Sequence, residues 1–270
     1  EPQEILPTVE VYPVEGEPVT LTVETQGTVT PRTETVLTAE VSGLIEWVAP
    51  QFVDGGFFKK GDPLLQLEQI EYESAVANAE ATVARARLAL AQEEAQAEQA
   101  RSDWENLGRG DPSPLVVREP QLARARAELA SAEAALAVAR RNLERTTVRA
   151  PYDGRIRRKL ADRGQVVNAR VTQLAQIYSV DVAEVRLPIT AVDTGYLELP
   201  ELYRDGDGAE PAAKPTVEIR AEYGGGTHTW NGTVDRTEGA IDSRSRMTYV
   251  VAQVHDPYGR SAGGNRPPLK

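Results

Sequence analysis

Apolar residues recur every seven positions between Glu71 and Arg145, and this heptad pattern constrains the fold more than any other feature of the sequence. In the first stretch, one series of seam positions holds Val76, Val83, Leu90, Ala97 and Trp104. The second series holds Ala79, Ala86, Glu93, Ala100 and Leu107, with Glu93 as its one charged member. A second stretch repeats the pattern with Leu122, Leu129, Leu136 and Leu143, and with Ala125, Ala132 and Ala139 between them. This spacing predicts two coiled-coil helices.

A segment rich in glycine and proline, residues 108–114, separates the two stretches. Because proline removes a backbone donor and both residues disfavour helix interiors, no helix is expected to continue through it. The sequence therefore predicts an antiparallel α-hairpin over residues 71–145. At about 1.5 Å per residue the first helix would extend roughly 50 Å, which is too long and thin for a globular core.

A pattern of strand, glycine turn and strand occurs on both sides of the predicted hairpin. Gly43 and Ile45 correspond to Gly154 and Ile156 in the second copy, and Gly56 is matched with Gly164. An internal repeat of this kind indicates two copies of one structural unit. We therefore expect one small β domain made of two interlocked halves, with the helices inserted at their junction.

The remainder of the chain is typical of short strands that form a small barrel or sandwich. Val19, Leu21 and Val23 alternate with polar residues, which predicts a half-buried strand near the N-terminus. Four further strands are expected at Val182–Leu187, Thr216–Ala221, Thr229–Arg236 and Thr248–Val254. A short helix is expected over Thr190–Leu197 with Thr190 as its N-cap, and a loop over Arg204–Pro215. A closed barrel would need one more strand after Pro267, so the sequence is expected to stop short of it.

Composition excludes several classes of function. The 270 residues suffice for two or more domains, and 40% hydrophobic with 26% charged residues is typical of an ordinary soluble protein. A net charge of −11 argues against nucleic-acid binding, which needs clustered Lys and Arg. Cysteine is absent, so neither disulfides nor thiolate sites are expected. The chain opens on Glu1-Pro2 without Met, so we expect that an upstream signal or anchor preceded it.

Four segments together resemble the periplasmic adaptor family, also called membrane fusion proteins, of tripartite resistance-nodulation-division efflux systems. The segments are Val41-Ser42-Gly43-Leu44-Ile45, the glycine-bearing run at 56–65, the stretch at 142–154, and Trp230 to Val234 followed by Asp242 to Arg246. The resemblance covers nearly the whole chain. It implies a mixed α and β, elongated multi-domain fold, in which an antiparallel coiled-coil α-hairpin is inserted in a lipoyl-like β domain and a small β-barrel follows.

The resemblance also implies domain boundaries. Residues 1–25 correspond to partial membrane-proximal strands, 26–36 with 181–270 to the β-barrel, 37–70 with 146–180 to the lipoyl-like domain, and 71–145 to the α-hairpin. Family adaptors sit in the periplasm and are anchored to the inner membrane through an N-terminal lipid or helix. They assemble as a ring, typically a hexamer, between an inner-membrane RND-type transporter and an outer-membrane channel.

The hairpin tip departs from the family pattern of Arg, Leu and Ser at fixed spacing. Leu107 stands at the Leu position, but Asp103 stands at the Arg position and Arg118 at the Ser position. A divergent channel or a second adaptor is therefore an alternative partner. Leu115, Val116 and Val117 form an apolar run on an exposed turn, and such a patch often marks a partner surface. The residues expected to dock the partner are Leu107, Arg109, Leu115, Val116 and Arg118.

The sequence offers no site for catalysis, cofactor or metal, and we expect none. Lys59 and Lys60 precede a glycine turn and are expected to be solvated, not lipoylated. Met247, His228 and His255 lie too far apart for a metal site, so organic cargo is favoured. Asp205-Gly206-Asp207-Gly208 lacks the rest of a calcium loop, the Arg-Gly-Asp at 109–111 is explained as a helix-breaking tip, and Asn231-Gly232-Thr233 is interpreted as a tight turn.

Three alternatives to an RND-system adaptor stay open at this stage. One is an adaptor of an ATP-driven exporter, against which the Trp230 to Arg246 segments argue. The second is a lipoyl-carrier subunit, whose measured mass would exceed the mass calculated from its sequence. A coiled-coil adhesin has only the Arg-Gly-Asp at the tip in its favour.

Overall fold

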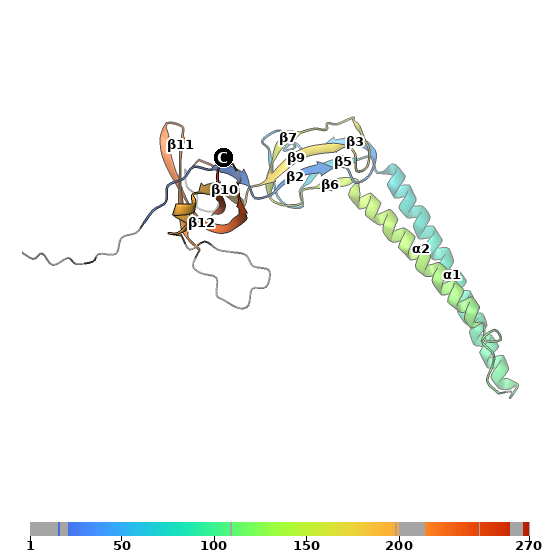
Figure 1. The fold of residues 1–270 in the computed structure, drawn as a ribbon. Coiled ribbons are helices and arrows are strands. Elements are labelled where there is room, and N and C mark those ends of the chain that lie inside the picture. The colour runs from blue at the N-terminus through green and yellow to red at the C-terminus, as the bar shows by residue number, and fades with distance from the viewer. Residues whose placement is uncertain are drawn as a thin grey trace, which may run out of the picture. The chain divides into compact units, whose positions relative to one another are not determined.

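The computed structural model describes residues 16, 21–108, 110–197, 199, 214–242, 244–259 and 267–269 (Figure 1). Helices and strands both occur, so the expected mixed α and β class is confirmed. The chain divides into two compact units. One contains residues 31–183 with 256–268, and the other contains residues 1–30, 184–255 and 269–270.

The unit formed around residues 31–183 contains two four-stranded sheets. The first has the order β2 (Glu34–Thr38), β9 (Gln173–Ser179), β7 (Gly154–Lys159) and β4 (Phe57–Phe58). The second has the order β6 (Thr147–Arg149), β5 (Pro63–Leu67), β3 (Gly43–Val48) and β8 (Val166–Val167). Each sheet thus takes two strands from each copy of the repeat, and the two orders are equivalent. The two copies interlock, as the repeat predicted.

Reciprocal hydrogen bonds fix the equivalence of the two copies and correct one detail. The amide of Gly55 donates to the Ile156 carbonyl at 2.8 Å, and the amide of Gly164 donates to the Ile45 carbonyl at 2.9 Å. Both glycines have positive φ, +80° and +84°, a conformation that favours glycine. Gly55 is therefore the counterpart of Gly164, and the expected match of Gly56 with Gly164 is wrong by one residue.

The core of this unit is built from both copies. Its largest fully buried side chains are Ile45, Phe52, Leu64, Leu65, Leu67, Ile156, Val167, Leu174 and Ile177. Burying an aliphatic or aromatic side chain contributes about 1.5–3 kcal/mol. Because the two copies share one core, neither is expected to fold alone.

Helices α1 (Ile70–Asn106) and α2 (Glu119–Arg145) lie in the chain between β5 and β6. These two strands pair antiparallel, so the chain leaves and returns at neighbouring strands. Two hydrogen bonds fix the base of the helices, one to the residue before β3 and one between the caps of the two helices. The Tyr72 hydroxyl donates to the Ser42 carbonyl at 2.6 Å, and the Gln69 amide donates to the Thr146 hydroxyl at 2.7 Å.

Burial along the helices follows the predicted heptad seam. Val83 and Ala97 are buried in α1, and Ala125 and Ala132 are buried in α2. Between Val76 and Trp104, every residue that is not exposed is a seam position. The seam prediction is confirmed up to Trp104, whereas Leu107 is exposed.

Three ion pairs join the two helices at intervals of seven residues. Arg140 pairs with Glu80 at 2.6 Å, Glu133 with Arg87 at 2.8 Å, and Arg126 with Glu94 at 3.7 Å. From one pair to the next, the residue number rises by seven on α1 and falls by seven on α2, as expected for two antiparallel helices. We call these three ion pairs the ladder. Exposed ion pairs contribute only about 0–1 kcal/mol each, so the ladder specifies the register of the two helices more than it stabilises the hairpin.

The other unit is organised on a five-stranded sheet. Its order is β1 (Thr28–Pro31), β10 (Val182–Ile189), β13 (Thr248–His255), β12 (Gly226–Ile241) and β11 (Thr216–Tyr223). Val185, Leu187, Ile189, Val234, Val250 and Ala252 form its core. The four predicted strands are present, each extended at one or both ends.

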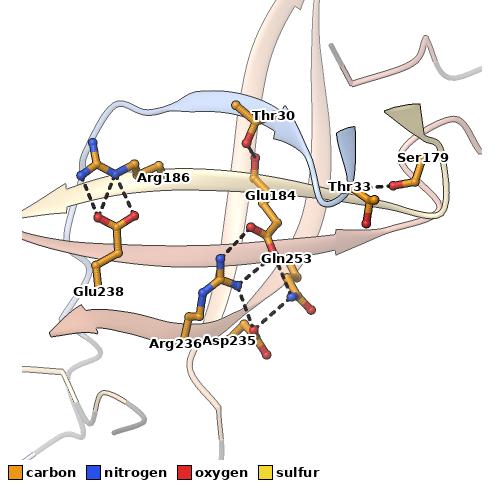
Figure 2. A network of polar contacts seen from close by, with 9 residues as sticks. All are labelled: Thr30, Thr33, Ser179, Glu184, Arg186, Asp235, Arg236, Glu238 and Gln253. Carbon is orange, nitrogen blue, oxygen red and sulfur yellow. Dashed lines mark hydrogen bonds and ion pairs between the residues drawn. The ribbon is translucent and has the colours of Figure 1, made fainter. Parts of the chain in front are cut away.

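A polar network crosses this sheet (Figure 2). Arg236 binds both carboxylate oxygens of Glu184, at 2.9 and 2.8 Å, and contacts Asp235. Gln253 donates to Glu184 and Asp235. These hydrogen bonds link β10, β12 and β13, and the bond from Arg236 is the main cause that lowers the pKa of Glu184.

The short helix α3 (Ala191–Thr194) follows β10. The Thr190 hydroxyl accepts a hydrogen bond from the Asp193 amide at 3.2 Å. The predicted N-cap is therefore confirmed, but the helix is shorter than Thr190–Leu197.

Several other expectations need correction. Residues 21–27 form no strand, and Val19 lies outside the described residues, as does most of the Arg204–Pro215 loop. Asn231-Gly232-Thr233 lies inside β12 and is not a turn. The turn before β12 is at Gly224 and Gly225, both with positive φ.

Two expected boundaries also differ from the strand pairing. Residues 34–36, expected in the barrel, belong to β2 and pair with β9. Asp256 and Tyr258, also expected in the barrel, belong to the unit formed around residues 31–183. The Tyr258 ring packs edge-on against Phe57 with 5.9 Å between centroids, and its hydroxyl lies 3.3 Å from that of Tyr178.

Candidate docking site at the hairpin tip

The tip of the hairpin is the segment 107–118, which joins the end of α1 to the start of α2. Gly108 has a positive φ of 59°, which suits the point where the helix stops. The indole N–H of Trp104 donates to the Gly110 carbonyl at 2.6 Å and so fastens the segment to the last turn of α1. The turn extends beyond the expected 108–114, because α2 begins only at Glu119.

The second part of the tip folds into a compact turn. The amide of Val116 donates to the Ser113 carbonyl at 2.9 Å, and the amide of Glu119 donates to the Pro114 carbonyl at 3.0 Å. The amide of Arg118 donates to the Leu115 carbonyl. The apolar residues of this turn are thus held by the backbone on fixed sides.

Three of the predicted docking residues are exposed aliphatic side chains. Leu107 is 63% exposed, Leu115 70% and Val116 40%. Val117 is only 4% exposed, so the expectation that the whole run Leu115–Val117 faces solvent is wrong for its third member. Arg109 lies outside the described residues. We call Leu107, Leu115 and Val116 the tip patch.

Arg118, the fifth predicted docking residue, is engaged within the hairpin. Its Nε lies 2.6 Å from Glu93 Oε1, and its Nη2 lies 3.0 Å from Glu93 Oε2. This hydrogen bonding is the main cause that lowers the pKa of Glu93 below its ordinary value and raises the pKa of Arg118. Arg118 is therefore bound to a carboxylate and does not stand free for a partner.

Charged residues lie near the tip patch in the sequence. Asp103, Glu105 and Asp111 are exposed, and Asp103 accepts a hydrogen bond from Gln99 at 2.9 Å. Apolar residues with a polar rim are typical of protein interfaces. Residues 93–119 contain no histidine or cysteine. The arrangement is suited to binding a protein surface.

Sequence reasoning missed two members of the site. Glu93 was visible only as a break in the heptad seam, and the break itself was the signal that a cation had to lie nearby. Trp104 was assigned to the seam, and its hydrogen bond to Gly110 had no sequence signal.

Neither a metal-binding cluster nor a membrane-spanning helix is found among the described residues. Among them, no three His, Cys, Asp or Glu side chains are grouped so that they could hold a metal ion. No described helix combines the length and the apolar character needed to cross a bilayer.

Comparison with known proteins identifies relatives. The toluene efflux pump periplasmic linker protein TtgD of Pseudomonas putida (strain DOT-T1E) is 30% identical over 194 residues, covering 68% of this chain and 44% of TtgD. The multidrug efflux pump subunit AcrA of Escherichia coli (strain K12) is 26% identical over 249 residues, covering 89% of this chain and 61% of AcrA. The chain thus spans about half the length of these curated relatives. No protein-family model matches the chain.

Among solved structures, the membrane fusion protein Spr0693 from Streptococcus pneumoniae R6 aligns with a TM-score of 0.57 and 18% identity. The alignment covers 85% of this chain and 88% of that structure, so the two share a fold. Together with the sequence relatives, this establishes that the chain belongs to the membrane fusion protein family of periplasmic adaptors.

Proposed function

We propose that this chain is the periplasmic adaptor of a tripartite efflux pump, bridging an inner-membrane transporter and an outer-membrane channel for export of organic compounds. The observation that carries the proposal is the tip patch, three exposed aliphatic side chains at the end of an antiparallel hairpin. The function is that of a non-enzymatic scaffold. The relatives named as efflux linkers and pump subunits support this role and a periplasmic location.

The direct test places a charge on the tip patch. Val116→Asp and Leu107→Asp should abolish export of an organic dye from cells that depend on this chain, because an interface cannot easily desolvate a carboxylate. The purified variants should keep the circular dichroism and melting temperature of the original. Normal export from both variants would contradict the proposal.

A matched control is available on the shaft of the hairpin. Leu88 on α1 is an exposed aliphatic side chain, like those of the tip patch, but lies away from the tip. Leu88→Asp introduces the same charge and should leave export unchanged. A loss of export in this variant as large as that in Val116→Asp would show that the assay reports hairpin charge in general.

The partner type is the finer part of the proposal. We favour a proton-driven RND-type transporter over an ATP-driven exporter because of the Trp230 to Arg246 segments named above. Site-specific cross-linking from exposed Tyr223 on β11, followed by identification of the captured membrane protein, would decide between them. Recovery of an ATPase subunit alone would refute the RND assignment.

Assembly into a ring, with six copies as the expected number or with a second adaptor as partner, belongs to the same proposal. Native mass spectrometry of the full-length protein would measure it. The proposed modules are the lipoyl-like domain, the barrel, the α-hairpin and the membrane-proximal strands, with the shifts at residues 34–36 and 256–258 described above. Anchoring to the inner membrane is proposed on the family resemblance.

A further inference from the structure

Glu93 is a carboxylate at a position where the coiled-coil seam calls for an apolar side chain. Its side chain is only 17% exposed. A charge drawn away from water is unfavourable unless a partner of opposite charge is bound to it. Glu93 is not part of the ladder, because the ladder pair next to it joins Glu94 to Arg126.

The partner comes from the far end of the tip. Arg118 reaches Glu93 with two nitrogens, one on each carboxylate oxygen. This bidentate geometry is the strong form of an arginine–carboxylate pair and fixes orientation as well as distance. The two residues are 25 positions apart, and everything between them is the end of α1 and the tip.

The backbone of Arg118 reinforces this assignment. It is in the left-handed region, with φ 59° and ψ 25°, and forms the N-cap of α2 without a side-chain cap. Glycine adopts this conformation without strain and arginine does not. If the position served only to turn the chain, glycine would suit it better, so the guanidinium has its own role.

The arginine of this pair lies directly after the tip turn, whose residues differ in exposure. Val117, next to Arg118, is buried, while Leu115 and Val116 are exposed. Releasing Arg118 would free the turn to rotate and to bury a different member of this run.

We propose that Glu93 and Arg118 form a clasp that holds the tip patch in its docking orientation. Arg118 is a positioning residue and not a contact residue. This inference rests on the proposed function, because it takes the tip patch to be the surface that the partner binds.

Hydrogen exchange tests the clasp without any partner. Arg118→Gly relieves the backbone and removes the guanidinium, while Glu93→Gln removes the charge. Amides 116–119 should exchange at least tenfold faster in both variants, and amides of the shaft should not change. Arg124→Ala, which removes an exposed arginine paired with Glu128 on the same helix, is the control and should leave the tip unchanged. Unchanged tip exchange in both clasp variants would overturn the clasp.

Export tests the positioning role. Arg118→Gly keeps Leu107, Leu115 and Val116, yet export should fall to the level of Val116→Asp. Normal export despite a loosened tip would overturn the positioning role. If Val116→Asp itself exports normally, the proposed function fails instead, and hydrogen exchange alone then decides whether the clasp exists.

Discussion

The two copies of the β repeat have the same strand order and the same reciprocal hydrogen bonds, but their equivalent positions tolerate different residues. Gly43 and Gly154 begin equivalent strands. A Cβ on Gly43 would lie an ordinary 3.5 Å from its nearest neighbour, whereas one on Gly154 would lie 2.5 Å from the Tyr178 carbonyl oxygen. Gly61, with φ +87°, has Arg170, with φ +62°, as its counterpart. The comparison teaches that the repeat dictates topology, while local packing dictates which residues must be small.

The largest expected effects test whether the two copies share one core equally. Ile45 and Ile156 are equivalent and both are fully buried. Replacing either by alanine should lower the free energy of unfolding by about 2–5 kcal/mol, because a cavity remains. Urea unfolding followed by Trp47 fluorescence, in a background with Trp104→Phe and Trp230→Phe, measures it. If one variant loses several times more than the other, the copies do not contribute equally.

Alanine substitutions at Gly154 and Gly43 should differ sharply in their effect on the free energy of unfolding. Gly154→Ala should cost about 1–3 kcal/mol, since the new methyl meets backbone and the Phe58 ring. Gly43→Ala should be neutral or slightly stabilising, because it reduces the freedom of the unfolded chain without strain. The same urea experiment compares them, and equal losses would contradict the packing difference.

Substitutions at Gly61 and Arg170, the equivalent positions with positive φ, should differ less in their effect on stability. Gly61→Ala should cost about 1 kcal/mol, because a side chain is strained at positive φ although space is free around it. Arg170→Gly should change stability by only a few tenths of a kcal/mol, since relief of strain offsets the added freedom of the unfolded chain. Differential scanning calorimetry resolves both. A stabilised Gly61→Ala would refute the conformational argument.

A pH experiment tests the contact between Tyr258 and Tyr178 of β9. Burial, with the hydrogen bond to Tyr178, raises the pKa of Tyr258 to about 12. Unfolded tyrosine ionises near 10, so this contribution to stability is complete below pH 10 and is lost as the pH rises toward 12. Tyr258→Phe should flatten that part of the stability profile. An unchanged loss above pH 10 would mean that another group is responsible.

Much of the fold could be predicted because it depends on residues that recur at regular intervals in the sequence. The heptads predicted the helices and their seam, the repeat predicted interlocked halves, and Thr190 predicted a cap. The failures have a common physical cause, which is that they depend on contacts between residues distant in sequence. Gly55 is identified by its bond to Ile156, and Arg118 by its bond to Glu93. Burial of Val117 depends on how the tip folds back.

The same limit explains the docking residues. The exposure of Leu115 and Val116 could be predicted from an apolar run on a turn, whereas Leu107 also fitted the heptad seam. Sequence alone could not separate Val117 from Val116, or a bound arginine from a free one, because neighbours in the run share composition but not surroundings.

The ladder of ion pairs has a consequence for the evolution of this molecule. Seam and ladder both advance by seven residues, so deleting seven from each helix would remove one complete layer and leave the remaining pairs in register. One such step shortens the hairpin by about 10 Å. Since β5 and β6 pair with each other at the base of the hairpin, we expect that the hairpin can lengthen or shorten by whole layers without redesign of the domain that carries it.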